Sequence, residues 1–210
     1  MSVLMNKDSR VVIQGFGGAG QREAATGIAY GTQIVCGVTP GRGGEVINGV
    51  PIRNTVEEAV REFNVNVSLI FVPAPFAADA ILEAERAGLP LIICITEGIP
   101  VLDMVRVKRV LRNSASRLIG PNCPGVISVR DRARAGIMPV DVYLEGNVGV
   151  ISRSGTLVYE TVDQLTRLGM GQSSSVGVGG DPIIGTTQRE ALQLFEEDPD
   201  TAAVVLIGEI

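Results

Sequence analysis

The sequence contains no histidine and no tryptophan, and only 4% of its 210 residues are aromatic. Any mechanism that needs a histidine is therefore excluded within these residues. There are three cysteines, Cys36, Cys94 and Cys123, and none of them forms a CxxC pair. Neither a disulfide framework nor a zinc site is indicated, and a reducing compartment fits this pattern best.

Long apolar runs are also missing. No run reaches the roughly 18 residues that a membrane helix needs, and the polar start from Met1 to Arg10 is no secretory signal. We therefore expect a protein of the cytoplasm, or of the mitochondrial matrix after import, with no membrane contact and no metal of its own. The net charge of −5 argues against a broad nucleic-acid surface, but it is compatible with a local cationic pocket for a phosphate.

Short apolar runs alternate with amphipathic segments through the first part of the chain. Strands rich in Val, Ile and Leu without clean alternation are buried on both faces, and helices between them imply βαβ units in a parallel sheet. The sequence therefore predicts an α/β fold. The expected strands are Val11 to Gly15, Gln33 to Val38, Ser68 to Val72, Leu91 to Thr96 and Arg117 to Gly120, and the expected helices are Gln21 to Tyr30, Val56 to Phe63, Ala77 to Ala87 and Leu102 to Arg112.

The stretch from Pro121 to Gly146 breaks this rhythm with prolines, glycines and a charged patch. We predict a first domain over residues 1–122, a connection over 123–146 and part of a second parallel α/β domain over 147–210. The second series comprises strands at Asn147 to Ser152, Ser174 to Val178 and Ala202 to Gly208, and helices at Thr156 to Leu168 and Thr187 to Phe195.

A chain that stops directly after a strand is expected to be truncated or to be completed by a partner. The strand near Val204 to Ile207 should then present an unpaired edge and promote aggregation.

A glycine loop follows the first strand and opens a helix. It matches G-x-G-x-x-G at Gly15, Gly17 and Gly20, a pattern that allows a tight turn and brings helix N–H groups to a phosphate. A glycine-rich turn without a ligand is the alternative. NAD sites hold the ribose with an acid at the end of the second strand, and the stretch Thr39 to Gly44 at that place contains no acid before Glu45. Arg42 instead suits a phosphate on the adenosine end of coenzyme A or NADP, unless it is only a solvated loop charge.

Polar residues also follow later strands, where ligands bind in open parallel sheets. Glu97 can accept a hydrogen bond from a ligand or cap the next helix. A Pro/Gly turn fixes Asn122 and Cys123, and without a histidine as base Cys123 is expected to contact a ligand rather than to act as nucleophile. Ser154 or Thr156 can cap a helix whose first N–H groups form a phosphoryl site, although an ordinary helix cap is equally compatible.

Nine blocks in this order and spacing resemble the α-subunits of succinyl-CoA synthetase along the whole chain. They are Gln14–Phe16, Ala29–Thr32, Gly37–Gly41, Phe71–Pro75, Ile95–Pro100, Gly120–Gly125, Ile151–Leu157, Val178–Pro182 and Ile207–Ile210. The resemblance implies a CoA-binding Rossmann-like domain followed by an incomplete flavodoxin-like domain.

The same resemblance implies an acid–thiol ligase of the tricarboxylic acid cycle that joins succinate to CoA through a phosphohistidine. It also implies a β-subunit, in a heterodimer or heterotetramer, that binds ATP or GTP with Mg. Malate or another acid is left open as the substrate. In this family the catalytic histidine lies in a loop beyond the point where this chain stops, so this chain alone is expected to be inactive.

The resemblance carries site roles onto matching positions. The CoA-contacting positions are Gly17, Gly18, Ala19, Gly20, Arg42, Ile95, Thr96, Glu97, Asn122, Cys123 and Pro124. Ser154, Gly155 and Thr156 would face the phosphoryl group, and Tyr159 would contact the substrate. Glu209 would orient the phosphohistidine.

The chain also departs from the family. Its first loop has Gly17 for threonine, is one residue shorter and lacks the Phe-His pair that follows. Arg42 stands for lysine, and Pro139-Val140-Asp141 replaces a Pro-Gly-His turn. These changes favour a second hypothesis, a non-catalytic protein that binds CoA or a β-subunit. An NADP-binding oxidoreductase is a remote third, because it leaves Ser154, Tyr159 and Glu209 unexplained.

Overall fold

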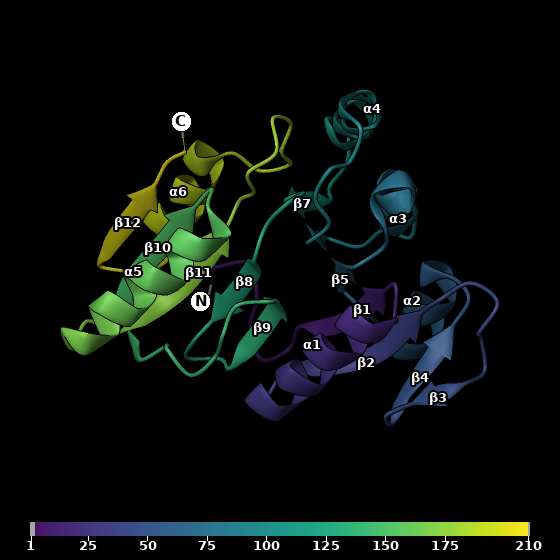
Figure 1. The fold of residues 1–210 in the computed structure, drawn as a ribbon, viewed down its shortest axis with the longest axis horizontal. Helices are drawn as coiled ribbons and strands as arrows, with labels where there is room; N and C mark the ends of the chain where they lie inside the picture. The colour runs from purple at the N-terminus through teal and green to yellow at the C-terminus, as the bar shows by residue number, and fades with distance from the viewer. Residues whose placement is uncertain (1–2, 210) are drawn as a thin grey trace.

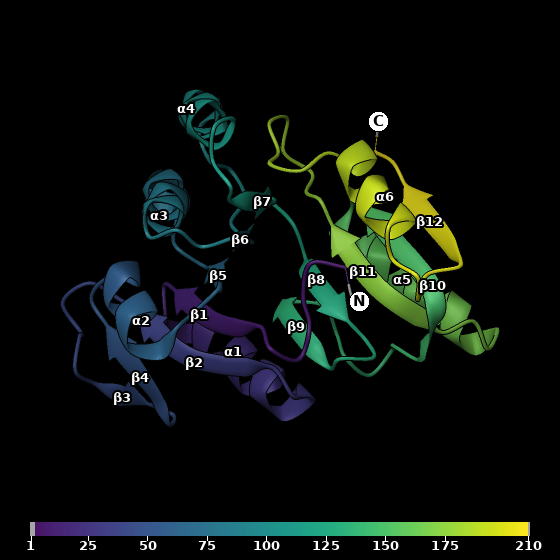
Figure 2. The ribbon, with the colours of Figure 1, turned by 180° about the vertical axis from the view of Figure 1, so that it is seen from behind.

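The computed structural model describes residues 3–209. Met1, Ser2 and Ile210, the last residue of the Ile207–Ile210 block, lie outside the described residues. Figure 1 shows two α/β units side by side, the first running from purple to teal and the second from green to yellow, and Figure 2 shows the same division from behind.

The first unit is built on a seven-stranded sheet in the order β3-β4-β2-β1-β5-β6-β7. All its neighbouring strands are parallel except β3 and β4, which form a hairpin. The strands are β1 (Arg10–Gln14), β2 (Gln33–Val38), β3 (Val46–Ile47), β4 (Val50–Arg53), β5 (Val67–Ile70), β6 (Leu91–Cys94) and β7 (Arg117–Ile119).

Helices cover this sheet because each one buries an apolar stripe. They are α1 (Gly18–Tyr30), α2 (Val56–Phe63), α3 (Ala74–Arg86) and α4 (Val101–Leu111). One face packs Val12, Cys36 and Ile70 against apolar residues of α2, α3 and α4. The opposite face packs Val11 and Ile13 against α1 and continues into the second unit, so the two units share one core.

The second unit is built on a five-stranded sheet in the order β12-β10-β11-β8-β9. Its elements are β8 (Gly125–Ser128), β9 (Ala133–Gly136), β10 (Glu145–Ser152), α5 (Gly155–Arg167), β11 (Gln172–Gly177), α6 (Gln188–Glu196) and β12 (Ala203–Ile207). Strand β10 is parallel to β11 and β12, whereas β8 is antiparallel to both β11 and β9. The sheet is mixed.

The predicted α/β class is confirmed, and each of the fourteen predicted strands and helices has a counterpart shifted by three residues or fewer at either end. Two hairpins were missed, β3–β4 and β8–β9. The expectation of a purely parallel second domain was wrong, because the segment 123–146 contributes β8 and β9 to its sheet. Both strands have four residues, and their glycines and the charged Arg134 interrupt the apolar pattern by which a strand is predicted. The predicted domain boundaries themselves stay a prediction.

A buried ion pair ties the two units together on the side of β9. Arg134 is only 3% exposed, and its guanidinium pairs with Glu23 of α1 at 2.6 Å. The same guanidinium donates to the Met138 carbonyl at 2.6 Å, and Thr32 exchanges hydrogen bonds with the Arg134 backbone. The charged patch predicted as part of a linker therefore sends one arginine into the core.

Within residues 3–209, no helix has both the length and the apolar content required to cross a bilayer.

Glu23→Ala is expected to lower the free energy of unfolding by about 3 kcal/mol, because it leaves the buried Arg134 guanidinium without its counter-charge. Urea denaturation measures the loss. Glu62→Ala is the matched control, since it removes one partner of the exposed Arg53–Glu62 pair and should cost less than about 1 kcal/mol. Similar losses in the two variants would contradict the role given to Arg134.

Strand β12 lies at the edge of its sheet, and Leu206 on it is 48% exposed. Leu206→Lys is expected to reduce aggregation, because a charge on an edge strand opposes pairing with another chain. Light scattering during concentration of the protein measures the effect. Leu168→Lys, on a side chain 72% exposed at the end of α5 and outside any strand, serves as control and should change little.

Candidate functional site

The first glycine loop joins β1 to α1, and it leaves the start of α1 without a side-chain cap. Gly20 packs directly on the strand end, since an added Cβ would lie 2.7 Å from the Gly15 carbonyl oxygen. A Cβ on Gly17 would meet nothing within 4 Å, and one on Gly18 would meet only an arginine side-chain end. The loop is thus tight beneath and open above, which fits a phosphate held by the N–H groups of the first helical turn.

The loop that carries Arg42 is held by Asn54, whose side-chain oxygen accepts hydrogen bonds from the N–H groups of Gly41 and Gly43 at 2.9 and 3.0 Å. Arg42 is half-exposed and pairs with Glu45 at 2.6 Å. This hydrogen bond lowers the pKa of Glu45 and raises that of Arg42. A phosphate that binds Arg42 must therefore compete with Glu45, a partner that was not foreseen.

The end of β6 lies beside the end of β5. The Thr96 hydroxyl donates to the Val72 carbonyl at 2.6 Å, and Ile95 is half-buried against the core. Glu97 is exposed, and the helix that follows, α4, begins at Val101 with Pro100 at the N-cap position and no side-chain cap. Of the two roles considered for Glu97, helix capping is therefore not what the structure shows.

The turn after β7 connects the two units. The Asn122 N–H donates to the Thr96 carbonyl at 2.9 Å, and its side-chain amide donates to Asp181 at 2.9 Å. The Asn122 carbonyl in turn accepts from the Gly180 N–H at 2.9 Å. Asn122 therefore links the end of β6 in the first sheet to the loop that follows β11 in the second.

The thiol of Cys123 does not point toward the loops that Asn122 joins. The side chain is buried, its sulfur lies 3.2 Å from the Cys94 carbonyl, and burial raises the pKa of the thiol far above its usual range. The expected thiol contact with a ligand is therefore not supported, because the side chain points into the core. Pro124 is buried as well, and it packs against Gly177 and Gly155 where α5 begins.

The sequence offered Ser154 and Thr156 as the residue that caps α5, and the structure shows one of them in this role. Ser154, not Thr156, is the N-cap residue, and its side chain accepts from the Leu157 N–H at 3.3 Å. Ser152 lies beneath it, with its hydroxyl bonded to both the N–H and the carbonyl of Ser154. The N–H groups of Gly155 and Thr156 remain for an anion, since they belong to the first turn of the helix.

Glu209 lies close to the loop after β11, on the side of that loop where Asn122 also lies. An added Cβ on Gly180 would lie 3.2 Å from a Glu209 carboxylate oxygen and 3.5 Å from the Asn122 amide nitrogen. Gly179 has φ of 108°, and a side chain there would overlap the Pro121 carbonyl. These glycines let the loop approach both Asn122 and Glu209.

Neither Arg153 nor Asp181 was singled out from the sequence, although the segment Gly177 to Pro182, which contains Asp181, was expected to line the same site. The Arg153 guanidinium donates to the carbonyls of Gly179, Gly180 and Asp181 at 3.3, 3.2 and 3.0 Å. It thereby fixes the loop that faces Glu209. The sequence feature that could have identified Arg153 is its position, between the end of strand β10 and the N-cap residue Ser154.

Tyr159 lies one turn into α5 and is half-buried against the cluster formed with Ile127, Met138 and Val150. Burial raises the pKa of its hydroxyl. The cluster around Asn122 brings together Thr96, Asn122, Gly180, Glu209, Arg153 and Asp181. Within residues 3–209, no hydrogen bond or ion pair joins Tyr159 or Arg42 to this cluster.

Two sequence families match the chain, in the order expected. Residues 6–98 match the CoA binding domain, and residues 151–210 match the CoA-ligase family. In solved structures, the fold resembles ATP citrate lyase from Methanosaeta concilii in complex with (3S)-citryl-CoA, with a TM-score of 0.85, 22% identity, and coverage of 99% of this chain and 37% of that chain. It also resembles the dinucleotide-forming acetyl-coenzyme A synthetase 1 of Korarchaeum cryptofilum, with a TM-score of 0.81, 24% identity, and coverage of 95% and 43%. At these identities the likeness concerns the fold.

Full-length curated relatives are much more similar. The α-subunit of ADP-forming succinate–CoA ligase from Staphylococcus epidermidis is 56% identical over 211 residues, and that from Aquifex aeolicus is 54% identical over 213 residues. Both alignments cover 100% of this chain and 70% of the relative. The resemblance seen in the nine sequence blocks is confirmed, and the chain belongs to the succinate–CoA ligase α-subunit family.

Proposed function

We propose that the chain acts as the α-subunit of a succinate–CoA ligase, in which it holds CoA and positions the phosphoryl group. The observation that carries this proposal is the position of Asn122, which bonds to Thr96 on one side and to the Gly180 loop facing Glu209 on the other. A CoA site on the first sheet and a phosphoryl site on the second would then meet at one edge.

CoA would lie along the carboxyl ends of the strands in the first sheet. The open backbone of Gly17 to Gly20 would take its phosphates, and Arg42 would take the phosphate on its adenosine end in place of Glu45. Backbone groups of Ile95 to Glu97 and of Asn122 to Pro124 would guide the remainder of the ligand toward α5. Cys123 would contribute main chain only, because its thiol is buried.

The phosphoryl site would be the start of α5. The N–H groups of Gly155 and Thr156 suit an oxyanion, and the Ser154 cap fixes the turn that presents them. Glu209 would orient a phosphohistidine, and Tyr159 would contact the succinate carbon chain.

In the ligase reaction a phosphoryl group from ATP or GTP passes to succinate, and the CoA sulfur then displaces phosphate from the acyl phosphate. These residues contribute binding, orientation and charge complementarity to that reaction. The histidine that carries the phosphoryl group is not among the 210 residues, and a β-subunit would supply the nucleotide with its Mg.

A second candidate function is CoA or β-subunit binding without catalysis. The observation that favours it is the complete lack of histidine in the sequence. Both candidates predict CoA binding, and only the ligase needs the phosphoryl site.

Arg42→Ala is expected to weaken CoA binding at least about tenfold, since it removes a charge-assisted contact to the phosphate on the adenosine end. Binding of 3′-dephospho-CoA, which lacks that phosphate, should be nearly unchanged. Isothermal titration with both ligands measures the difference.

Arg61→Ala is the matched control for this titration. Arg61 is also an exposed arginine beside a glutamate, but it lies on α2 away from the loop that carries Arg42. Equal weakening of both ligands by Arg42→Ala, or no weakening of either, would remove Arg42 from the site.

The 210-residue chain mixed with a family β-subunit and radiolabelled ATP or GTP is expected to acquire no acid-labile phosphate, because it has no histidine to accept it. A histidine-containing α-subunit of the family, labelled in parallel, is the positive control. An acid-labile label on this chain would mean that another residue accepts the phosphoryl group, and the role given to Glu209 would have to be abandoned.

A further inference from the structure

A cavity of about 420 Å³ lies near the start of β7, whereas the candidate site lies beyond the end of that strand. Its walls come from the end of α4, the turn that leads into β7, and the segment that enters α6. The residues that line it are Lys108, Leu111, Arg112, Ser114, Ala115, Ser116, Arg117, Leu118, Gly185, Thr186 and Glu190. Both units therefore contribute to one cavity.

Three cations face this cavity, Lys108, Arg112 and Arg117. Within residues 3–209, none of the three takes part in an ion pair with a carboxylate. This concentration of positive charge stands out in a chain whose net charge is −5.

The one acid in the lining, Glu190, is already engaged. Its carboxylate accepts from the Thr187 N–H and from the Thr187 hydroxyl, both at 2.7 Å, and so completes the capping box of α6. Glu190 therefore serves the helix cap, and the cavity keeps an excess of positive charge.

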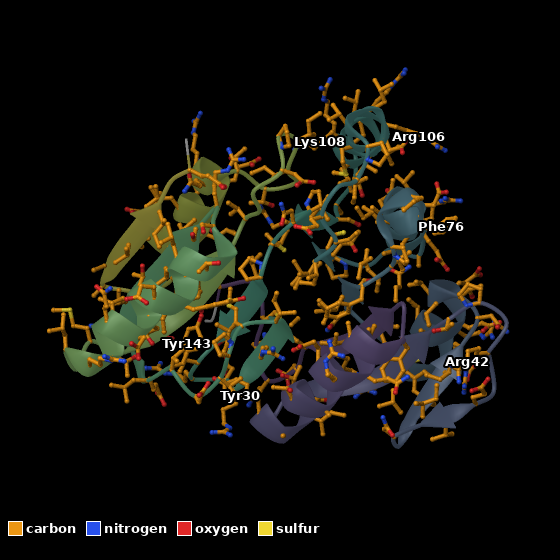
Figure 3. All side chains as sticks on the ribbon, in the orientation of Figure 1. Tyr30, Arg42, Phe76, Arg106, Lys108 and Tyr143 are labelled. Atoms are coloured by element: carbon orange, nitrogen blue, oxygen red, sulfur yellow. The ribbon has the colours of Figure 1, made fainter. Side chains whose placement is uncertain are left out.

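Lys108 is held in place by the second unit. Its ammonium group donates to the Gly185 carbonyl at 2.6 Å, and that contact uses one of its three N–H donors. Figure 3 shows Lys108 on the side of α4 that faces this loop, and Arg106 on the other side of the helix. Two donors of Lys108 remain for a ligand.

The turn before β7 is rigid. The Ser114 hydroxyl oxygen accepts from the Ser116 N–H at 3.1 Å, and the Ser116 hydroxyl donates to the Leu89 carbonyl at 2.7 Å. The Arg117 N–H donates to the Pro90 carbonyl at 2.8 Å. These bonds fix the backbone of Ser114 to Arg117, so that the cations do not depend on a loose loop.

We propose that this cavity is a binding site for a small phosphate-bearing anion, held by Lys108, Arg112 and Arg117 and bridging the two units. Arginine pairs with phosphate oxygens through two parallel hydrogen bonds, and a lysine adds a compact third charge. The volume lies within the range of small-molecule sites. Since its lining comes from both units, an anion bound there stabilises their contact.

Thermal unfolding of the chain against inorganic phosphate, at constant ionic strength set with chloride, tests the site. We expect a saturable rise in Tm, because a ligand that binds only the folded state stabilises it by mass action. In Arg112→Ala/Arg117→Ala the phosphate concentration for half-maximal effect should rise at least about tenfold. Arg112→Ala alone, on an exposed side chain, should show part of the same loss if the double variant fails to fold.

Arg106→Ala/Arg109→Ala is the matched control. It removes two arginines from the same helix, but both are exposed and neither lines the cavity. This variant should keep the wild-type response. An unsaturable response, or equal loss in both double variants, would overturn the proposal, and so would a response to succinate with none to phosphate.

A titration with glycerol 3-phosphate distinguishes the source of the phosphate. Tighter binding of this ester than of inorganic phosphate indicates a phosphorylated metabolite. Equal or weaker binding indicates free phosphate. Either result counts only if Arg112→Ala/Arg117→Ala weakens the binding. Because neither arginine belongs to the proposed CoA site or phosphoryl site, this test is independent of the proposed function.

Discussion

The arrangement of the candidate site depends on the hydrogen bonds of one residue, Asn122. Its N–H, side-chain amide and carbonyl bond to Thr96, Asp181 and Gly180 respectively, so it fixes the end of the first sheet relative to the second. The first sheet and the parallel strands β10, β11 and β12 of the second sheet each have carboxyl ends of the kind at which ligands bind, and the Asn122 hydrogen bonds join loops from both. The candidate site is therefore formed at the junction and not within either unit.

Around this junction, two arginine side chains hold segments of backbone in place. Arg153 holds the loop that faces Glu209 through three carbonyls, and Arg134 ties β9 to α1 through a buried pair with Glu23. The stretch that Arg153 holds, Gly179 to Asp181, carries no apolar side chain. A guanidinium can satisfy several carbonyls or a carboxylate at once, so it can hold a loop that has no apolar side chain to bury.

Sequence reasoning was strongest where one physical signal was sufficient. An apolar run and an amphipathic pattern placed β2 and α2 at their observed bounds, and the Ser154 cap was one of two candidates. It failed at β8 and β9, whose burial results from tertiary contact rather than from their own pattern. It also could not show that Glu45 pairs with Arg42 or that the Cys123 thiol points inward, because both depend on the direction of a side chain.

The groups of the candidate site around Asn122 include no side chain that suits bond-breaking chemistry on its own. The Cys123 thiol is buried with its pKa raised, and the sequence offers no histidine as base or nucleophile. What the edge does offer is backbone N–H groups at two helix starts, a carboxylate at Glu209 and a fixed turn between them. Such groups bind and orient charged ligands, so in the function proposed above a phosphohistidine, and not these residues, would carry the phosphoryl group.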